Sequence, residues 1–116
     1  MNLDTYHEDR PWGGFDQFIH NEPCTVKILT VHPEKRFSLQ KHSRRSEFWQ
    51  VIEGSGTVHI GDVEKEVSVG DRIEIPVDTL HRLTGGPAGI KVLEIARGEF
   101  DENDIERVED DFGRIT

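Results

Sequence analysis

Short runs of β-branched and aromatic residues recur along the chain, and helical periodicity is almost absent before Gly98. The runs follow one another at intervals of about 8 to 12 residues, which is the spacing of an all-β sandwich or barrel. We therefore predict an all-β fold. The predicted strands are Thr25 to Val31, Arg36 to His42, Glu47 to Ile52, Thr57 to Ile60, Val63 to Val67, Arg72 to Ile75, His81 to Leu83 and Ile90 to Ala96.

Turn signals separate the later strands. Gly61 and Asp62 predict a two-residue hairpin turn, because glycine readily takes the positive φ that such turns require. Further along, Asp101 is placed as the N-cap of a short helical turn that reaches Ile105. The last stretch, residues 106–116, is too charged to form a core alone, so we expect its few apolar side chains to anchor it on the barrel.

Composition places these strands in one acidic domain. We predict a single domain over residues 1–116, with an N-terminal arm at 1–24, a barrel at 25–97 and a C-terminal segment at 98–116. A net charge of -9 argues against a nucleic-acid partner, because phosphate binding needs a basic face. The single Cys24 excludes an internal disulfide, and no apolar run is long enough to cross a membrane. We therefore expect a soluble, cytoplasmic protein with no membrane partner.

Strand alternation gathers a set of polar side chains. Gln40 and His42 are two residues apart on one predicted strand and therefore point to the same face. Glu47 opens the next predicted strand, and the turn after Pro76 brings His81 back across the barrel. One amide, two imidazoles and one carboxylate can together hold a divalent cation. The sequence therefore predicts a metal centre, and zinc, iron, manganese, cobalt and nickel all suit this set of ligands.

Two motifs in the chain resemble those of the cupin superfamily. Their spacing is carried by Gln40, His42, Glu47 and Gly54, and then by Gly70, Pro76 and His81. The details resemble the C-terminal cupin domain of type II phosphomannose isomerases. The segments that carry this similarity are Arg10-Pro11-Trp12-Gly13, Ser38-Leu39-Gln40, Glu47-Phe48-Trp49, Ile75-Pro76, His81-Arg82-Leu83, Ile105-Glu106-Arg107 and Glu109-Asp110-Asp111-Phe112-Gly113-Arg114. The resemblance implies a double-stranded β-helix, which is a jelly-roll barrel.

The resemblance also implies roles for individual residues. It makes Gln40, His42, Glu47 and His81 the metal ligands. Glu47, His81 and Arg45 are expected to take part in catalysis. The residues expected to hold the phosphate of a substrate are Arg45, Lys41, Arg107 and Arg114.

The implied activity is the interconversion of mannose 6-phosphate and fructose 6-phosphate, in the supply of mannose for polysaccharides. Four ligands leave two positions open on an octahedral ion, which can then stabilise an enediolate. The base stays open among Lys27, Lys41, Glu94 and a metal-bound hydroxide. Arg44 and Phe48 stand where many relatives have histidine, so proton transfer by those histidines is not assumed. The nucleotidyltransferase part that often precedes this domain is missing, so sugar-nucleotide synthesis by this chain alone is not expected.

Two other functions fit the same residues. One is a non-catalytic module that binds a sugar phosphate, and the other is a cupin dioxygenase or another metal oxidoreductase. The arginines near the C-terminus favour a sugar phosphate over the substrate of a dioxygenase.

Two aromatic residues bear on how the barrel is covered. Phe48 and Ile52 lie on the strand face opposite Glu47, so they predict an apolar outer surface that a homodimer would bury. Trp12 is expected to pack on the barrel or close it as a lid, rather than to contact a sugar.

Overall fold

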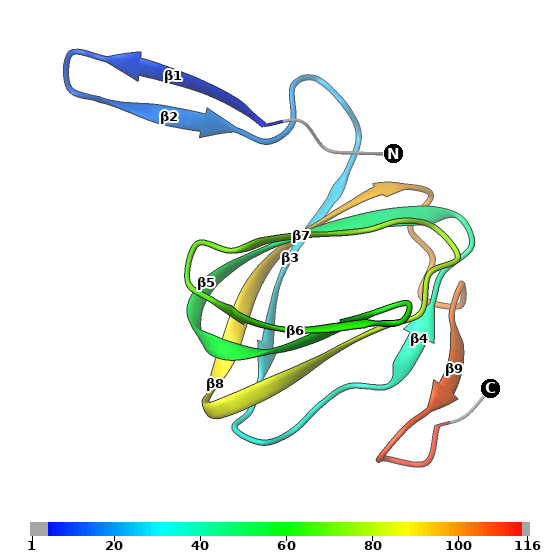
Figure 1. Ribbon diagram of the computed structural model, residues 1–116. Coiled ribbons are helices and arrows are strands. Elements are labelled where there is room, and N and C mark those ends of the chain that lie inside the picture. Colours follow the sequence, from blue (N-terminus) through cyan, green and yellow to red (C-terminus); the bar gives the residue numbers. More distant parts are fainter. Residues whose placement is uncertain (1–4, 115–116) are drawn as a thin grey trace.

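The computed structural model describes residues 5–114, and all regular secondary structure in that range consists of strands (Figure 1). Their bounds are β1 (Tyr6–Arg10), β2 (Gly13–Gln17), β3 (Thr25–Val31), β4 (Leu39–Lys41), β5 (Arg45–Ile60), β6 (Val63–Ser68), β7 (Arg72–Ile75), β8 (His81–Gly98) and β9 (Glu106–Glu109). The prediction of an all-β fold is confirmed. Residues 5–114 contain no helix long and apolar enough to cross a membrane.

Two long strands form the centre of the barrel. β5 pairs antiparallel with β8 from Arg45 opposite Gly98 to Ile60 opposite His81, and the register shifts at two places along the way. Such irregularities bend a strand and increase its twist, which helps a sheet to curl. The sequence predicted each of these strands as two shorter ones, so this part of the prediction is wrong.

Glycines explain why β5 and β8 were predicted as broken strands. Gly54 has a φ of 76°, and a Cβ there would lie 2.2 Å from the carbonyl oxygen of Gly89 on the facing strand. Only glycine fits this close approach of two backbones. A glycine that looks like a turn signal in the sequence therefore allows two strands to touch.

The shorter strands extend this centre. In the larger sheet the order is β6-β5-β8-β4-β9, while β3 pairs with β8 and β7 pairs with β5. The predicted strands at β3, β6 and β7 are confirmed, and so is the turn at Gly61, where Ile60 pairs with Val63. The strand predicted from Arg36 to His42 is shorter, because β4 covers only Leu39–Lys41 and Arg36 makes one isolated bridge to Thr84.

The inward-facing positions of β5 and β8 form the apolar core. Trp49, Leu83 and Val92 are completely buried, and Val51 and Val58 are nearly so. Burying one such aliphatic side chain stabilises the fold by roughly 1.5–3 kcal/mol. This core fills one part of the barrel. It holds in place the strands that carry the polar residues of the neighbouring part.

The N-terminal arm consists of a hairpin and a segment that packs on the sheet. β1 and β2 pair with each other and form a hairpin that projects from the barrel (Figure 1). Phe18, Ile19 and Cys24 then pack on Phe48 and Ile95, on the outer face of the sheet. Trp12 lies in the turn of the hairpin and is 73% exposed, so the expectation that it packs on the barrel or closes it is wrong.

The C-terminal segment lies along the barrel, but the expectation that its apolar side chains anchor it is wrong for the described residues, because Val108 is 44% and Phe112 is 62% exposed. β9 pairs with β4, which adds a strand that the sequence pattern did not reveal. The helical turn expected from Asp101 to Ile105 is absent; instead, the backbone N–H of Asp104 donates to the carbonyl oxygen of Asp101 at 2.9 Å in a single tight turn. The Asp101 side chain accepts a hydrogen bond from the Asn103 N–H, which favours a turn over a helix.

Candidate metal centre

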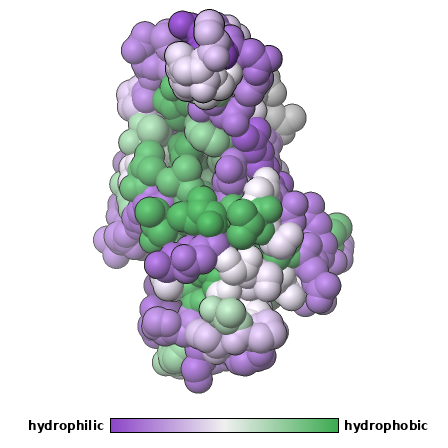
Figure 2. Space-filling view, turned by 90° about the vertical axis from the view of Figure 1, so that its left-hand side faces the viewer, coloured by the Kyte–Doolittle hydropathy of each residue, from purple (hydrophilic) through white to green (hydrophobic). Residues whose placement is uncertain are grey.

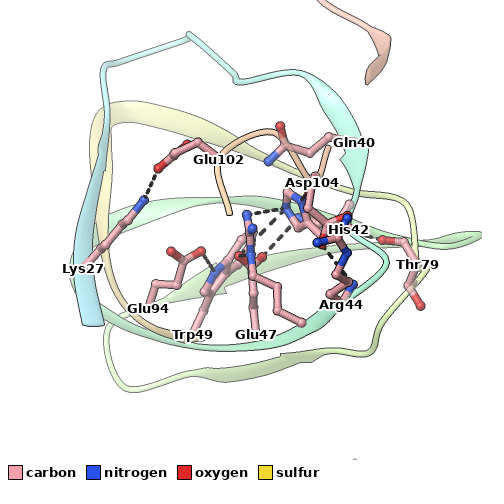
Figure 3. A network of polar contacts seen from close by, with 12 residues as sticks. Lys27, Gln40, His42, Arg44, Glu47, Trp49, Thr79, Glu94, Glu102 and Asp104 are labelled. Atoms are coloured by element: carbon pink, nitrogen blue, oxygen red, sulfur yellow. Dashed lines mark hydrogen bonds and ion pairs between the residues drawn. The ribbon is translucent and has the colours of Figure 1, made fainter. Parts of the chain in front are cut away.

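A polar pocket of about 360 Å3 opens into the barrel beside the core. Its walls come from segments far apart in the chain, including β3, β4, β5, β8, β9 and the turn before β9. The lining residues that matter below are Gln40, His42, Arg45, Glu47, Glu94 and Arg107. Figure 3 shows several of these side chains converging from different strands.

Three potential metal ligands meet in the interior. His42, Glu47 and His81 each offer one ligand atom, and these atoms all lie within 4.8 Å of one another. His81 Nε2 is 3.2 Å from Glu47 Oε1, and His42 Nε2 is 3.9 Å from Glu47 Oε2. All three residues are at most 6% exposed. The structure therefore brings together three of the four predicted ligands.

Backbone carbonyls fix both imidazoles in the tautomer that a metal needs. The Nδ1 atom of His42 lies 2.7 Å from the carbonyl oxygen of Asp104, and that of His81 lies 2.9 Å from the carbonyl oxygen of Thr79. A carbonyl only accepts, so each Nδ1 carries the proton and each Nε2 directs a lone pair toward the centre. Burial lowers the pKa of His42 from its usual 6.5, which favours the neutral ring.

The centre also contains unsatisfied acceptors. Among the described residues, Glu47 Oε1 and His81 Nε2 are buried and have no hydrogen-bond partner. Burial by itself raises the pKa of a carboxyl, but the hydrogen bond and positive charge that His81 offers when protonated, with the charge of a protonated His42, outweigh it and lower the pKa of Glu47 to about 2. Glu47 is therefore ionised at neutral pH. Two unpaired acceptors facing each other cost free energy, and a divalent cation would satisfy both, so the donor set fits a metal.

Gln40, the fourth predicted ligand, comes from the neighbouring strand. It lies on β4 directly opposite His81 and lines the pocket. Its Oε1 atom accepts a hydrogen bond from Ser38 Oγ at 2.7 Å. Because an amide oxygen has two lone pairs, one remains for a cation.

Asp104 is a site residue that the sequence analysis missed. Its carboxylate accepts hydrogen bonds from the Ser43 N–H at 3.0 Å, the Ser43 hydroxyl at 2.7 Å and the Arg44 N–H at 2.9 Å. The bonds from Ser43 and Arg44 lower the pKa of Asp104 to about 2. Its backbone carbonyl meanwhile orients His42. Asp104 is 61 positions from Ser43, so no local pattern could have connected them.

Arg45 lies deeper than a phosphate-binding residue is expected to lie. Its Nε donates to Glu47 Oε2 at 3.2 Å, and its Nη2 lies 3.2 Å from His42 Nε2. Its Nη1 donates to the Asp101 carbonyl at 3.1 Å, and the guanidinium lies 4.1 Å from the ring centroid of Phe100. The residue is 7% exposed. Arg45 therefore contacts two of the predicted metal ligands.

The other predicted substrate-binding residues separate into two places. Arg107 and Arg114 both line the pocket, and in the described part of the chain the buried Nε of Arg107 has no hydrogen-bond partner. The Nε of Arg114 donates to Asp110 at 2.8 Å. Lys41 lies on the opposite side of β4 from Gln40 and lines a different hollow. The structure therefore does not bring Lys41 to the site.

Two of the residues considered as a base also line the pocket. Glu94 is 5% exposed and accepts a hydrogen bond from Trp49 Nε1 at 3.1 Å. Burial and the nearby negative charge of Glu47 raise the pKa of Glu94 to about 7. Lys27, in contrast, donates to Glu102 at 2.9 Å, near the solvent. Glu94 is thus the buried carboxyl of the pocket beside Glu47.

Comparison with known proteins agrees with this architecture. The alginate biosynthesis protein AlgA of Pseudomonas aeruginosa is 36% identical over 107 residues, which are 90% of this chain and 22% of that protein. The mannose-1-phosphate guanylyltransferase ManC of Salmonella typhimurium is 34% identical over 108 residues, which are 91% of this chain and 22% of that protein. The chain thus spans about a fifth of the length of these curated relatives.

Solved structures and a family model identify the fold and the family. A cupin 2 conserved barrel domain protein from Rhodopseudomonas palustris has a TM-score of 0.64 at 20% identity, over 72% of this chain and 62% of that chain. This likeness confirms the predicted cupin barrel. The model described as mannose-6-phosphate isomerase C-terminal matches residues 2–110. The chain therefore belongs to the family of mannose-6-phosphate isomerase C-terminal domains.

Proposed function

We propose that this protein is a metal-dependent isomerase that interconverts mannose 6-phosphate and fructose 6-phosphate. The observation that carries the proposal is the composition of one pocket. It combines His42 and Glu47 of the buried ligand cluster, a buried carboxyl with a raised pKa and an arginine N–H without a partner among the described residues. An aldose-ketose isomerase needs these three functions, for the carbonyl, the carbon-bound proton and the phosphate.

Metal binding falls to His42, Glu47 and His81, with Gln40 as the fourth ligand. The two orphaned atoms of Glu47 and His81 support this assignment. A divalent ion bound there supplies an electrophile for the adjacent carbonyl and hydroxyl oxygens of an open-chain sugar. The carbonyls of Asp104 and Thr79 keep the imidazoles in place for this task.

Glu94 is the best-placed base for the proton transfer. Its carboxylate would take the proton from C2 of mannose 6-phosphate, and the electron pair of that C–H bond forms the double bond of an enediol. Glu94 would then return the proton to C1. Over the two steps O1 gains a proton and O2 loses its hydroxyl proton, which gives fructose 6-phosphate. A pKa near 7 suits a group that must both accept and release a proton. The indole N–H of Trp49 holds the carboxylate in position.

Arginines at the pocket wall provide the phosphate contacts. Arg107 has a free Nε donor, and a guanidinium matches the geometry of phosphate oxygens. Arg114 lines the same pocket and is half exposed, so it can turn toward a ligand. Binding energy from a phosphate held away from the reacting carbons would fix the position of the sugar chain.

The departures at Arg44 and Phe48 do not weaken this proposal. Arg44 points outward and lies 3.5 Å from Glu99, with its side chain 53% exposed. Phe48 faces the outside of the sheet, where Phe18 covers it. A histidine at either position would lie outside the pocket. The replacements therefore remove no group that could reach a substrate in it.

Two alternatives use the same pocket. A non-catalytic module would bind the sugar phosphate without turnover, and a cupin dioxygenase would consume oxygen. The arginines of the C-terminal segment support a phosphorylated ligand over the dioxygenase. The relatives named for alginate biosynthesis and guanylyl transfer support a place in the supply of mannose units for polysaccharides.

A turnover assay separates these three functions. The protein is stripped with a chelator, reloaded with zinc, manganese, cobalt, nickel or ferrous iron, and incubated with mannose 6-phosphate. We expect fructose 6-phosphate to form only in reloaded samples, with no oxygen uptake. Binding of the sugar phosphate without product would support the module, and oxygen uptake would support the dioxygenase.

A further inference from the structure

We propose that the guanidinium of Arg45 occupies the cation position of the metal-free protein and competes with a divalent ion for His42 and Glu47. Arg45 would thereby set the metal affinity of the centre. This inference rests on the metal site of the proposed function, but not on the isomerase reaction. It concerns which cation sits between the ligands, and it can be measured without a substrate.

The contacts of Arg45 lie on the atoms that a metal would use. Its Nη2 is 3.2 Å from His42 Nε2, whose lone pair is fixed by the bond from Nδ1 to Asp104. An imidazole nitrogen has one lone pair in the ring plane, so it accepts either this N–H or a metal, not both. The Nε of Arg45 takes a lone pair of Glu47 Oε2 in the same way. Metal binding at His42 therefore requires the Arg45 contact to break.

The positive charge of Arg45 also disfavours metal binding. Arg45 is permanently positive and 93% buried with Glu47, whose carboxylate it neutralises in part. A second cation entering next to the guanidinium is repelled, because a buried site screens charges poorly. At the same time, the ion gains less from Glu47 while the arginine shares that carboxylate. Both effects lower the affinity for a metal as long as Arg45 stays in place.

Arg45 also has contacts that a metal would leave intact. Its Nη1 donates to the Asp101 carbonyl, and its guanidinium lies over the Phe100 ring. Neither partner belongs to the predicted ligand set. These contacts keep a displaced guanidinium beside the pocket, where its freed N–H groups become available to an anion. Metal loading and anion binding would then support each other, since each uses a group that the other releases.

The test compares the metal affinities of two charge-matched variants. Arg45→Gln removes the competing charge from the centre, whereas Arg44→Gln removes the same charge from the exposed neighbour. Zn²⁺ is titrated into each purified protein against a chromophoric chelator. We expect Arg45→Gln to bind Zn²⁺ about tenfold more tightly than the wild type, a difference of about 1.4 kcal/mol. Arg44→Gln should stay within about twofold of the wild type.

An unchanged or weaker affinity of a folded Arg45→Gln protein would overturn the inference. So would an equal gain in Arg44→Gln, because net charge alone would then explain it. If neither protein binds Zn²⁺, both the inference and the metal-dependent isomerase fail. If Zn²⁺ binds as expected but no product forms, the inference stands and only the isomerase fails.

A measurement on the wild type covers the case in which Arg45→Gln does not fold. The buried Nε–H of Arg45 should give a protected side-chain resonance by NMR in the metal-free protein, assigned by its loss in Arg45→Lys. Saturating Zn²⁺ should shift this resonance and expose it to solvent exchange. A resonance that keeps its position and protection at saturation would contradict displacement of the guanidinium.

Discussion

Glu47 Oε1 and His81 Nε2 face each other at 3.2 Å inside the barrel, and neither atom has a hydrogen-bond partner among the described residues. In the neutral His81 ring whose Nδ1 proton faces the Thr79 carbonyl, the Nε2 atom that faces Glu47 is an acceptor. We expect two acceptors in contact to destabilise the metal-free protein and a bound cation to remove this cost. This pair therefore connects the stability of the fold to metal binding.

The first prediction follows from this pair. His81→Ala and Glu47→Gln should each abolish the rise in melting temperature that Zn²⁺ gives to the wild type, because each removes a ligand of the proposed centre. Both should also lose isomerase activity. His59→Ala, on β5 and outside the site, is the matched control and should keep the full metal effect. Differential scanning fluorimetry with and without Zn²⁺ measures the shift, and an undiminished shift in both ligand variants would contradict the site.

The second prediction concerns the hydrogen bonds that the Asp104 carboxylate accepts from Ser43 and Arg44. Asp104→Asn should weaken metal binding about 10–100-fold, because the turn that orients His42 loses its attachment to Ser43 and Arg44. In the folded protein the pKa of Asp104 is about 2, below its usual 3.8. These hydrogen bonds therefore stabilise the fold fully above pH 3.8, and the effect is lost as the pH falls through about 2. Urea unfolding between pH 5 and 2 should therefore show a smaller loss of stability in Asp104→Asn than in the wild type. Equal pH profiles would contradict this role.

The third prediction separates the basic residues. Arg107→Ala should raise the KM for mannose 6-phosphate about tenfold or more, since the loss of a charge-assisted bond to phosphate weakens binding. Lys41→Ala should leave the KM nearly unchanged, because Lys41 lies outside the pocket. Steady-state kinetics of both variants gives the comparison. The reverse pattern would show that the phosphate binds in the hollow beside Lys41.

The fourth prediction is a homodimer. The sequence predicts it from Phe48 and Ile52, and the structure does not support the use of Phe48. Phe48 is covered within its own chain by Phe18, Ile19 and Cys24, so it cannot form the interface. Val26, Ile28 and Ile52 nevertheless stay exposed on the outside of β3 and β5, and Figure 2 shows hydrophobic surface below the projecting hairpin. We propose that a second copy covers this surface.

Sedimentation velocity tests the proposed dimer. The wild type should sediment as a dimer at micromolar concentration, and Ile28→Lys should sediment as a monomer because it buries a charge in the interface. Val69→Lys, at a similarly exposed valine away from this face, should remain a dimer. A monomeric wild type would contradict the proposal, and so would a dimer of Ile28→Lys with wild-type affinity.

The fold was predictable where the sequence pattern is local. β3 and β7 have the predicted bounds, and β6 differs by one residue, because alternation within a strand depends on its own sequence. β5 and β8 were divided because glycines such as Gly54 and Gly85 look like turn residues, although each lies where two backbone segments come close together. These close approaches depend on residues far apart in the chain, so no window of sequence reveals them.

The site was predictable to a similar extent. His42 and Glu47 follow from strand alternation, whereas Asp104 acts across a turn from a distant segment. For Arg45 the sequence did contain a signal of an inward-facing side chain. It precedes Glu47 by two positions on β5, so alternation places both on the inner face, but an arginine is usually expected at the surface. Its buried position depends on partners from both strand and turn, which only the structure shows together.

Hydrogen exchange at the substrate tests the central claim most directly. Metal-loaded protein is incubated with mannose 6-phosphate in heavy water, and deuterium at the carbons next to the carbonyl is followed by NMR. We predict deuterium incorporation together with fructose 6-phosphate, both abolished by a chelator, and neither in Glu94→Gln, which should still bind Zn²⁺. Glu53→Gln, the same change at the outer surface, should behave like the wild type. Metal-loaded wild-type protein that binds the sugar phosphate but shows neither exchange nor product would contradict the isomerase.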